Sequence, residues 1–299
     1  MKTLEQAVSI SLKNVLLATD FSEGSEKALK YAQAIAHRYG SRVHTVHVSG
    51  PDSYQLLEPD AFALTFDSPA GGSASLTNVL QGLLQGLPTQ TPLQQGAVWK
   101  VISDVAERNE IDLLVLASHG RQGIPRLLLG SVAEDVFRNV SCPVLTVGPD
   151  VKTCNAPELS IREVLLATQF EPDSAAPWYA ARLCDEFRAK LTVLHVSDER
   201  HKDRVIQTPA EFARQLYSVI PEEPALWQRP TFLLDYGVPS AKILEVAHRV
   251  QPDMIVLGAR HPEPATINSH LPWATAARVI AEAECPVLTV RQEGNDAYL

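Results

Sequence analysis

The residues of this chain that are best suited to do chemistry lie in one glycine-containing segment, residues 117–132. It reads Ala117-Ser118-His119-Gly120, then nine residues, then Gly130-Ser131-Val132. A short apolar run at 113–116 precedes it and is typical of a buried strand, and a helical pattern follows it. A strand that feeds a helix through such a loop presents unpaired backbone N–H groups, and the helix dipole favours negative charge there. Glycine admits a phosphate close to the backbone, so the segment predicts a phosphate site.

Two familiar phosphate-binding motifs are absent from the chain. No Gly-x-x-x-x-Gly-Lys-Ser/Thr occurs, and no Gly-x-Gly-x-x-Gly follows the first predicted strand. The segment is therefore neither a Walker-type loop nor a dinucleotide fingerprint. The alternative interpretation is a tight strand-to-helix turn that binds nothing.

Other polar residues offer weaker chemistry. His119 could act as an acid or base, but no carboxylate or nucleophile partner for it is evident nearby in the sequence, so we favour a loop-lining role and predict no catalytic residue. Asp20 follows another predicted strand and, taken alone, would be a helix-capping residue. His44 and His47 alternate with apolar residues, and His195 repeats His47, which favours packing over metal binding.

Several short motifs occur twice in the chain, in the same order. Val-Leu-Leu-Ala-Thr occurs at 15–19 and 164–168, His-Val-Ser at 47–49 and 195–197, and Cys-Pro-Val-Leu-Thr-Val at 142–147 and 285–290. We predict two copies of one domain, over residues 1–150 and 160–299, joined by a linker over 151–159. The segment at 117–132 has no intact counterpart in the second copy, so its chemistry is expected once per chain.

Each copy alternates β-branched apolar runs with segments of helical period, which is typical of an α/β fold with a parallel sheet. In the first copy we expect helices near 22–39, 75–87, 97–109 and 130–139, the first of them capped by Ser22. The expected strands of the two copies lie at about 13–19, 42–48, 89–94, 112–117 and 143–147, and at about 162–168, 191–197, 230–235, 253–258 and 286–291.

Composition narrows the classes of function. The 299 residues are 45% hydrophobic and 20% charged, with a net charge of −9 and scattered basic residues, which argues against nucleic-acid binding. No apolar run is long enough to span a membrane, and residues 1–13 do not resemble a secretion signal. The four cysteines lack metal-ligand spacing and disulfide density, so we expect reduced thiols and a cytoplasmic location.

Several motifs together resemble the universal stress protein family, and more narrowly its tandem two-domain members. They are Ala-Thr-Asp-Phe-Ser at 18–22, His-Val at 47–48, Ala-Ser-His-Gly-Arg-Gln-Gly from 117, Leu-Leu-Gly-Ser-Val-Ala-Glu from 128 and Cys-Pro-Val-Leu at 142–145. The resemblance implies a doubly wound five-stranded parallel sheet in each copy, in the order 3-2-1-4-5. It also implies a ligand at the carboxyl ends of strands 1 and 4, at the topological switch point.

The resemblance further implies an adenine nucleotide as the ligand: ATP, ADP or AMP, with or without Mg²⁺. Nucleotide-binding members carry Gly, two residues, Gly, nine residues, then Gly-Ser or Gly-Thr; this chain keeps the spacing but has Ala117 first. By resemblance, the adenine lies near Ala18, Thr19 and Val48, and Asp20 faces the ribose or a phosphate-bound Mg²⁺. The phosphates are held by Gly120, Arg121, Gly130, Ser131 and Val132, with Ser118 and His119 lining the loop.

The second copy departs from this pattern at the matching positions. Gln169 replaces Asp20, and His261 replaces Gly120. Pro-Glu-Pro follows at 262–264, and Trp-Ala at 273–274 stands in place of Gly-Ser. Proline removes donors and glutamate repels phosphate, so we expect no ATP there. Trp273 is expected to fill the vacated pocket, and a different ligand stacked on it is the alternative.

Three functions therefore remain open at this stage. The favoured one is a regulatory protein that binds a nucleotide and changes its conformation. Either an unidentified protein partner or the second half recognises that change. The alternatives are a slow ATP-hydrolysing enzyme and a ligand-free interaction scaffold. Homodimers of the family pair through the fifth strand, so the resemblance predicts that residues 144–147 and 287–290 meet within one chain as a pseudo-dimer. Further assembly into a homodimer stays open.

Overall fold

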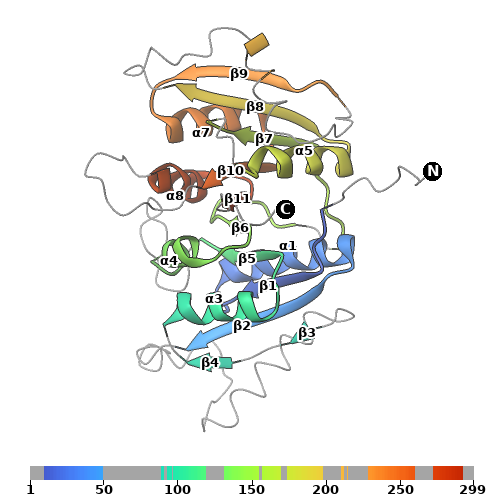
Figure 1. Ribbon diagram of the computed structural model, residues 1–299, viewed down its shortest axis with the longest axis vertical. Helices are drawn as coiled ribbons and strands as arrows, with labels where there is room; N and C mark the ends of the chain where they lie inside the picture. Colours follow the sequence, from blue (N-terminus) through green and yellow to red (C-terminus); the bar gives the residue numbers. More distant parts are fainter. Residues whose placement is uncertain are drawn as a thin grey trace, which may run out of the picture.

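A single sheet runs through the molecule and takes its strands from both copies of the repeat (Figure 1). The computed structural model describes residues 10–49, 89–90, 93–95, 97–118, 131–154, 157–169, 174–197, 210–211, 214, 228–259 and 272–291. Within these residues the sheet has 11 strands in the order β3-β2-β1-β5-β6-β11-β10-β7-β8-β9, and β4 also pairs with β2. The order in each half is therefore 3-2-1-4-5, as predicted.

The elements of the first half follow the predicted pattern closely. Its helices are α1 (Glu23–Tyr39), α3 (Val98–Arg108) and α4 (Ser131–Asn139). Its strands are β1 (Asn14–Ala18), β2 (Arg42–Ser49), β3 (Thr89–Gln90), β4 (Leu93–Gln95), β5 (Leu113–Ala117) and β6 (Val144–Val147). The helix expected near 75–87 lies outside the described residues.

The third strand of the first half differs from the prediction. One strand was expected at 89–94, whereas two short strands, β3 and β4, each pair in parallel with β2. Residues 91–92, which separate the two strands in the sequence, lie outside the described part of the chain.

The second half repeats the arrangement with more regular strands. Its helices are α5 (Ala176–Phe187), α7 (Pro239–Val250) and α8 (Pro272–Glu282). Its strands are β7 (Glu163–Ala167), β8 (Lys190–Ser197), β9 (Thr231–Tyr236), β10 (Met254–Ala259) and β11 (Val287–Arg291). Each expected strand of this half is confirmed to within a residue or two at either end.

Helix α1 shows why the local sequence folds as it does. Ser22 is its N-cap, and the Ser22 side chain accepts a hydrogen bond from the Ser25 N–H. Gly40 ends the helix in the left-handed region, with φ 66°, which a residue without Cβ adopts at low cost. Between these caps, Ala28, Ala32 and Ile35 face the sheet and are buried, as their spacing predicts.

The sheet has a hydrophobic core on each of its two faces. One core contains side chains from α1 and α5, and the other contains side chains from α3, α4, α7 and α8. Both cores draw on residues of both halves, so the apolar layers continue across the boundary between the copies. Of the described helices, none has the length and apolar character that crossing a bilayer requires.

The two halves meet where β6 pairs with β11, and this pair alone in the described sheet is antiparallel. Leu145 is opposite Leu288, and both are buried. The Thr289 hydroxyl donates to the Val144 carbonyl at 3.2 Å. The predicted meeting of the two fifth strands within one chain is confirmed, and we call this strand pair the seam.

The segment between the halves is held against α1. The Lys27 ammonium donates to the Pro149 carbonyl at 2.8 Å, and the Tyr31 hydroxyl donates to the Lys152 carbonyl at 3.0 Å. Helix α1 of the first half therefore also orients the chain that leads into the second.

Candidate functional site

Several predicted site residues come together at the carboxyl edge of the first half. The parallel register pairs Ala18 with Val46, which puts Val48 just beyond the end of β1. The Thr19 N–H donates to the Val46 carbonyl at 3.0 Å, and the N–H of the buried Ser118 donates to the Val147 carbonyl at 3.0 Å. Because parallel strands end at one edge, Ala18, Thr19, Asp20, Val48, Ala117 and Ser118 share it.

The phosphate side of the predicted site is described only at its far end. Ser131 is the first residue of α4 and Val132 the second, which agrees with the predicted helix start. His119, Gly120, Arg121 and Gly130 lie outside the described residues. The segment thus leads in the sequence directly into the N-terminus of α4, as the anion-site prediction requires.

Asp20 is held in a turn between β1 and α1. Its Oδ1 accepts the Ser22 N–H at 3.0 Å and the Ser25 hydroxyl at 2.5 Å. The Ser25 Oγ in turn accepts the Asp20 N–H at 3.2 Å. The carboxylate also lies at the N-terminus of α1, where the helix dipole favours negative charge. The interpretation of Asp20 as a helix-capping residue is therefore only partly correct. Asp20 stabilises the turn before α1, whereas Ser22 is the N-cap.

Phe21 is a member of this turn that sequence reasoning missed. Its φ of 60° lies in the left-handed region, which non-glycine residues rarely adopt. The Phe21 N–H donates to the Thr19 hydroxyl at 3.1 Å. Its ring lies 5.0 Å from that of His47, centroid to centroid, at an angle of 57°. No local pattern signals this conformation, because neighbouring side chains determine it.

The repeated histidine joins the ends of the first two strands in each half. His47 Nδ1 lies 2.8 Å from the Thr19 carbonyl oxygen, and His195 Nδ1 lies 2.9 Å from that of Thr168. Burial lowers the pKa of His195, which favours the neutral ring. In the described part of the chain, no three His, Cys, Asp or Glu side chains gather as a metal site. These contacts account for the histidines as structural residues.

The matching edge of the second half is built differently. The Gln169 amide donates to the Val196 carbonyl at 3.2 Å, so it spans from the end of β7 to β8. The corresponding Asp20 side chain turns toward its own helix instead. Gly258, opposite Val290 as Ala117 is opposite Val147, has Ser174 Oγ only 2.9 Å from the place a Cβ would take.

The other positions at which the second half departs from the nucleotide-binding pattern lie wholly or partly outside the described residues. Trp273 is the second residue of α8, and its side chain is outside the described part; His261 and residues 262–264 are outside it entirely. The expectation that Trp273 fills the vacated pocket, with a stacked ligand as the alternative, stays a prediction from the sequence.

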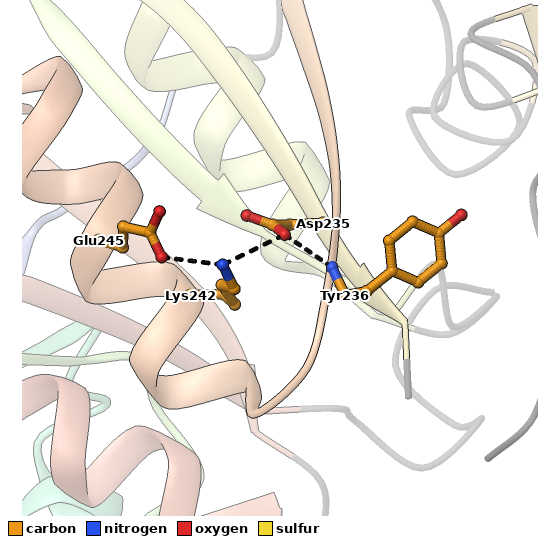
Figure 2. Close-up of polar contacts among 4 residues, drawn as sticks. All are labelled: Asp235, Tyr236, Lys242 and Glu245. Carbon is orange, nitrogen blue, oxygen red and sulfur yellow. Dashed lines mark hydrogen bonds and ion pairs between the residues drawn. The ribbon is translucent and has the colours of Figure 1, made fainter. Parts of the chain in front are cut away.

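A cluster of charged side chains beside β9 has a structural role. Figure 2 shows Lys242 of α7 between two carboxylates, with Nζ 3.5 Å from Asp235 Oδ1 and 2.9 Å from Glu245 Oε2. Asp235 Oδ1 also accepts the Tyr236 N–H at 2.8 Å. The hydrogen bond to Glu245 raises the pKa of Lys242. This cation links β9 to α7 and is already paired, so it is a poor candidate for a phosphate ligand.

The cysteines do not supply a nucleophile. All four thiols are free. Burial raises the pKa of both Cys142 and Cys285 to about 12, and it raises the pKa of Cys184 as well. Burial also raises the pKa of the half-buried Cys154, so all four thiols favour the protonated form, which is unreactive because the thiolate is the nucleophile.

Comparison with known proteins places this geometry in a family. The family described as Universal stress protein family matches the chain twice, over residues 11–148 and 160–291. Universal stress protein MJ0531 of Methanocaldococcus jannaschii is 32% identical over 149 residues, which make up 45% of this chain and 81% of that protein. Universal stress protein MJ0577 of the same organism is 28% identical over 160 residues, or 47% of this chain and 97% of that protein.

A solved structure agrees over nearly the whole length. The crystal structure of a universal stress protein from Archaeoglobus fulgidus DSM 4304 has a TM-score of 0.72 with 18% identity, covering 96% of this chain and 99% of that chain. At this identity the likeness concerns the fold, and it extends over both halves.

Proposed function

The chain belongs to the universal stress protein family and carries the domain of that family twice, and from this premise we propose that it is a regulatory protein that binds one adenine nucleotide in its first half. The halves are taken as residues 1–150 and 160–299, joined by residues 151–159. The nucleotide state of the first half is read by a protein partner or by the second half across the seam. We also propose a cytoplasmic location, which the four free thiols favour.

The observation that carries the proposal is the contrast between the matching edges of the two halves. In the first half, the Ser22 N–H and the Ser25 hydroxyl hold the Asp20 carboxylate in a fixed position. In the second half, the Gln169 amide stands at the matching position and donates to the Val196 carbonyl, and Ser174, the counterpart of Ser25, lies beside Gly258. The first edge thus carries a fixed carboxylate, whereas the second carries a neutral amide at the same position.

In the proposed complex, the adenine lies beside Ala18, Thr19 and Val48, and Asp20 faces the ribose or a magnesium ion. Ala117, Ser118 and His119 line the loop, and the phosphates are held by Gly120, Arg121, Gly130, Ser131 and Val132. Donors of the loop and of the first turn of α4 would neutralise phosphate charge, as helix N-termini do.

The described residues fit a magnesium ion only as a companion of the phosphates. Asp20 supplies one carboxylate at the edge, and no cluster of three acidic or imidazole ligands occurs among the described residues. Mg²⁺ keeps several waters and commonly uses one or two carboxylates with substrate phosphates. Asp20 would therefore orient a phosphate-bound ion, and the ion would supply charge neutralisation.

Titration calorimetry on nucleotide-stripped protein tests the proposal. We expect ATP or AMP to bind with a stoichiometry of one per chain. Gly130→Leu should abolish binding, because a side chain there removes the close approach of phosphate to backbone. The matched change in the second half, Trp273→Leu, should leave the affinity unchanged. Absence of heat at about millimolar nucleotide, which corresponds to about 4 kcal/mol of binding free energy, would refute the proposal.

A phosphate-release assay separates a binding protein from an ATPase. A dedicated enzyme typically turns over at about 1–1000 per second. We expect release slower than about once per minute, unchanged by Asp20→Asn or His119→Gln, since the sequence offers no evident dyad that would activate water. Release that is fast and lost in either variant would instead establish hydrolysis as the function.

A further inference from the structure

A second candidate site lies at the opposite end of the sheet, in a groove between the two halves. Two cavities of about 850 and 620 Å³ open there, and Arg38 lines both. The larger is lined by residues 10–14, 38–40, 42 and 186, and the smaller by residues 37–38, 157–162 and 187. Both volumes are within the ~300–1,000 Å³ of small-molecule sites. We call the two cavities together the inter-repeat groove.

The groove exists only because the halves are docked. The ends of α1 and α5 form its centre and lie on the same side of the molecule (Figure 1). The Tyr39 hydroxyl donates to Glu186 Oε2 at 2.6 Å, and the Arg38 guanidinium donates to the Glu186 carbonyl at 3.2 Å. The guanidinium also lies over the Phe187 ring, 5.2 Å from its centroid. Arg38 is therefore oriented by the second half.

The repeat places the same polar elements on both sides of Arg38. Ser-Leu-Lys at 11–13 precedes β1, and its counterpart Ser-Ile-Arg at 160–162 precedes β7. In each triplet the middle residue is buried, while the hydroxyl and the cation are exposed and line the groove. Each triplet thus contributes one hydroxyl and one cation to its own arm of the groove, and Arg42 adds a second cation to the arm of Lys13.

The charge of the groove is opposite to that of the chain. Its lining has four cations, Lys13, Arg38, Arg42 and Arg162, against the two carboxylates of Glu158 and Glu186, in a chain of net charge −9. The Glu186 carboxylate is already used by the Ile10 N–H at 2.7 Å and the Tyr39 hydroxyl. Within the described part of the chain, Lys13, Arg42 and Arg162 enter no ion pair.

We propose that the inter-repeat groove binds a small molecule with at least two phosphate groups. One phosphate is held in the arm of Lys13 and Arg42, the other in the arm of Arg162, and Arg38 lies between them. Guanidinium groups suit this role, because their planar fork donates two parallel hydrogen bonds to phosphate oxygens. Ser11 and Ser160 add one hydroxyl donor in each arm.

Calorimetric titration of the full chain tests the proposal with two probes, inorganic tripolyphosphate and fructose 1,6-bisphosphate. The Gly130→Leu background removes phosphate binding at the proposed nucleotide loop, so the result is independent of that proposal. We expect saturable binding of one molecule per chain, weakened by added salt because the contacts are exposed. The probe that binds more tightly identifies the source as inorganic polyphosphate or a phosphorylated metabolite.

Charge-removing variants locate the site. The triple variant Lys13→Gln, Arg42→Gln, Arg162→Gln should lower the affinity at least about tenfold, since each removes a charge-assisted contact. Lys190→Gln is the matched control: Lys190 pairs with Glu163 in β7 as Arg42 pairs with Asn14 in β1, and it lies outside the groove lining. It should change the affinity less than about twofold.

Three results would overturn the proposal. They are no saturable binding of either probe at millimolar concentration, an unchanged affinity in the triple variant, and an equal loss in Lys190→Gln. All three substituted side chains are exposed, so thermal unfolding of the triple variant should match that of the parent protein. If it does not, the single variants, each compared with Lys190→Gln, provide the same comparison.

Discussion

At the residue scale, the most consequential feature is the fixed carboxylate of Asp20. A charged hydrogen bond from a serine hydroxyl and one from a backbone N–H hold it in place. A side chain that is already ordered does not lose further conformational freedom when a ligand binds, so less of the interaction energy is lost. The turn thus holds a carboxylate in a fixed position beside the nucleotide site that we propose, and mutation can separate the roles of its two serines.

Ser25→Ala should weaken both the fold and nucleotide binding. It removes the hydroxyl that donates to Asp20 from a residue only 4% exposed. Loss of a hydrogen bond to a charged group costs about 1.5–3 kcal/mol of unfolding free energy, and we expect the affinity for ATP to fall about tenfold. Urea unfolding and calorimetry measure the two effects.

The control for this variant is Ser22→Ala. It removes the helix cap, at a cost of about 1 kcal/mol, but leaves both hydrogen bonds to Asp20, because one comes from the Ser22 backbone. Stability should fall while the affinity for ATP stays the same. An equal loss of affinity in the two serine variants would contradict the role given to Ser25.

His195 should make the protein less stable in mild acid. Burial lowers its pKa in the folded protein below the usual 6.5, so the unfolded chain binds more protons as the pH falls. Its contribution to stability is therefore complete above pH 6.5 and declines below it. His44 acts in the same direction, since burial, with a smaller effect of Arg42, lowers its pKa.

The measurement is the free energy of unfolding in urea between pH 8 and about pH 5. We expect His195→Asn to reduce the slope of stability against pH in the acid range, whatever it costs at neutral pH. His248→Asn is the comparison, because that side chain is 81% exposed and its loss leaves the buried histidines intact. A slope that His195→Asn leaves unchanged would show that other groups govern the acid response.

At the element scale, the strands and helices were largely predictable because their sequence patterns are local. β8 lies at Lys190–Ser197 where 191–197 was expected, since its run of Leu, Thr and Val contains no proline or glycine. The exception is the pair β3 and β4, two short described strands where one was expected, with residues 91–92 between them outside the described part of the chain. The sequence pattern located this part of the sheet but did not give the bounds of the two strands.

The candidate site was predictable only in part, because only some of its features follow from local sequence patterns. Asp20 and Ser118 were expected at one edge, because parallel strands end together. The contacts of Phe21 with His47, of Gln169 with Val196 and of Ser174 with Gly258 join residues far apart in the sequence. The inter-repeat groove was not foreseen at all, since it requires the docked halves.

The seam contains a pair of equivalent threonines that should respond oppositely to the same change. Thr289 Oγ1 donates to the Val144 carbonyl, whereas the buried Thr146 Oγ1 has no hydrogen-bond partner among the described residues. Thr289→Val should therefore cost about 1 kcal/mol of unfolding free energy. Thr146→Val removes an unsatisfied hydroxyl and should be neutral or stabilising by about 1 kcal/mol.

Urea unfolding of the two variants side by side makes this comparison. Both substitutions keep the β-branched shape and lie on paired strands, so packing changes are matched. Equal destabilisation in the two variants would mean that Thr146 also has a polar partner.

At the scale of the whole molecule, Gly148 controls how closely the halves approach. It follows β6, and a Cβ added there would lie 2.8 Å from the backbone carbonyl oxygen of Ile280 in α8. Gly148→Ala should therefore force the halves apart locally, at a cost of about 1–3 kcal/mol. Hydrogen exchange of the β6 and β11 amides should become faster.

Gly40→Ala separates this effect from a general loss of glycine. Gly40 has open space around it but a φ of 66°, so alanine there costs about 1–2 kcal/mol through the backbone alone. Stability should fall while exchange at the seam keeps its rate relative to the rest of the sheet. Faster exchange at the seam in both variants would show that Gly148 has no specific role in the docking of the halves.

The antiparallel pairing of β6 with β11 has a consequence for assembly. Two identical subunits joined through such strands would obey mass action, and dilution would part them. Here a short covalent connection keeps the partners at an effective concentration on the order of millimolar, whatever the amount of protein. The unfolding midpoint should thus be the same at every protein concentration. A cell that holds only a few copies of this chain would still hold every one of them fully paired.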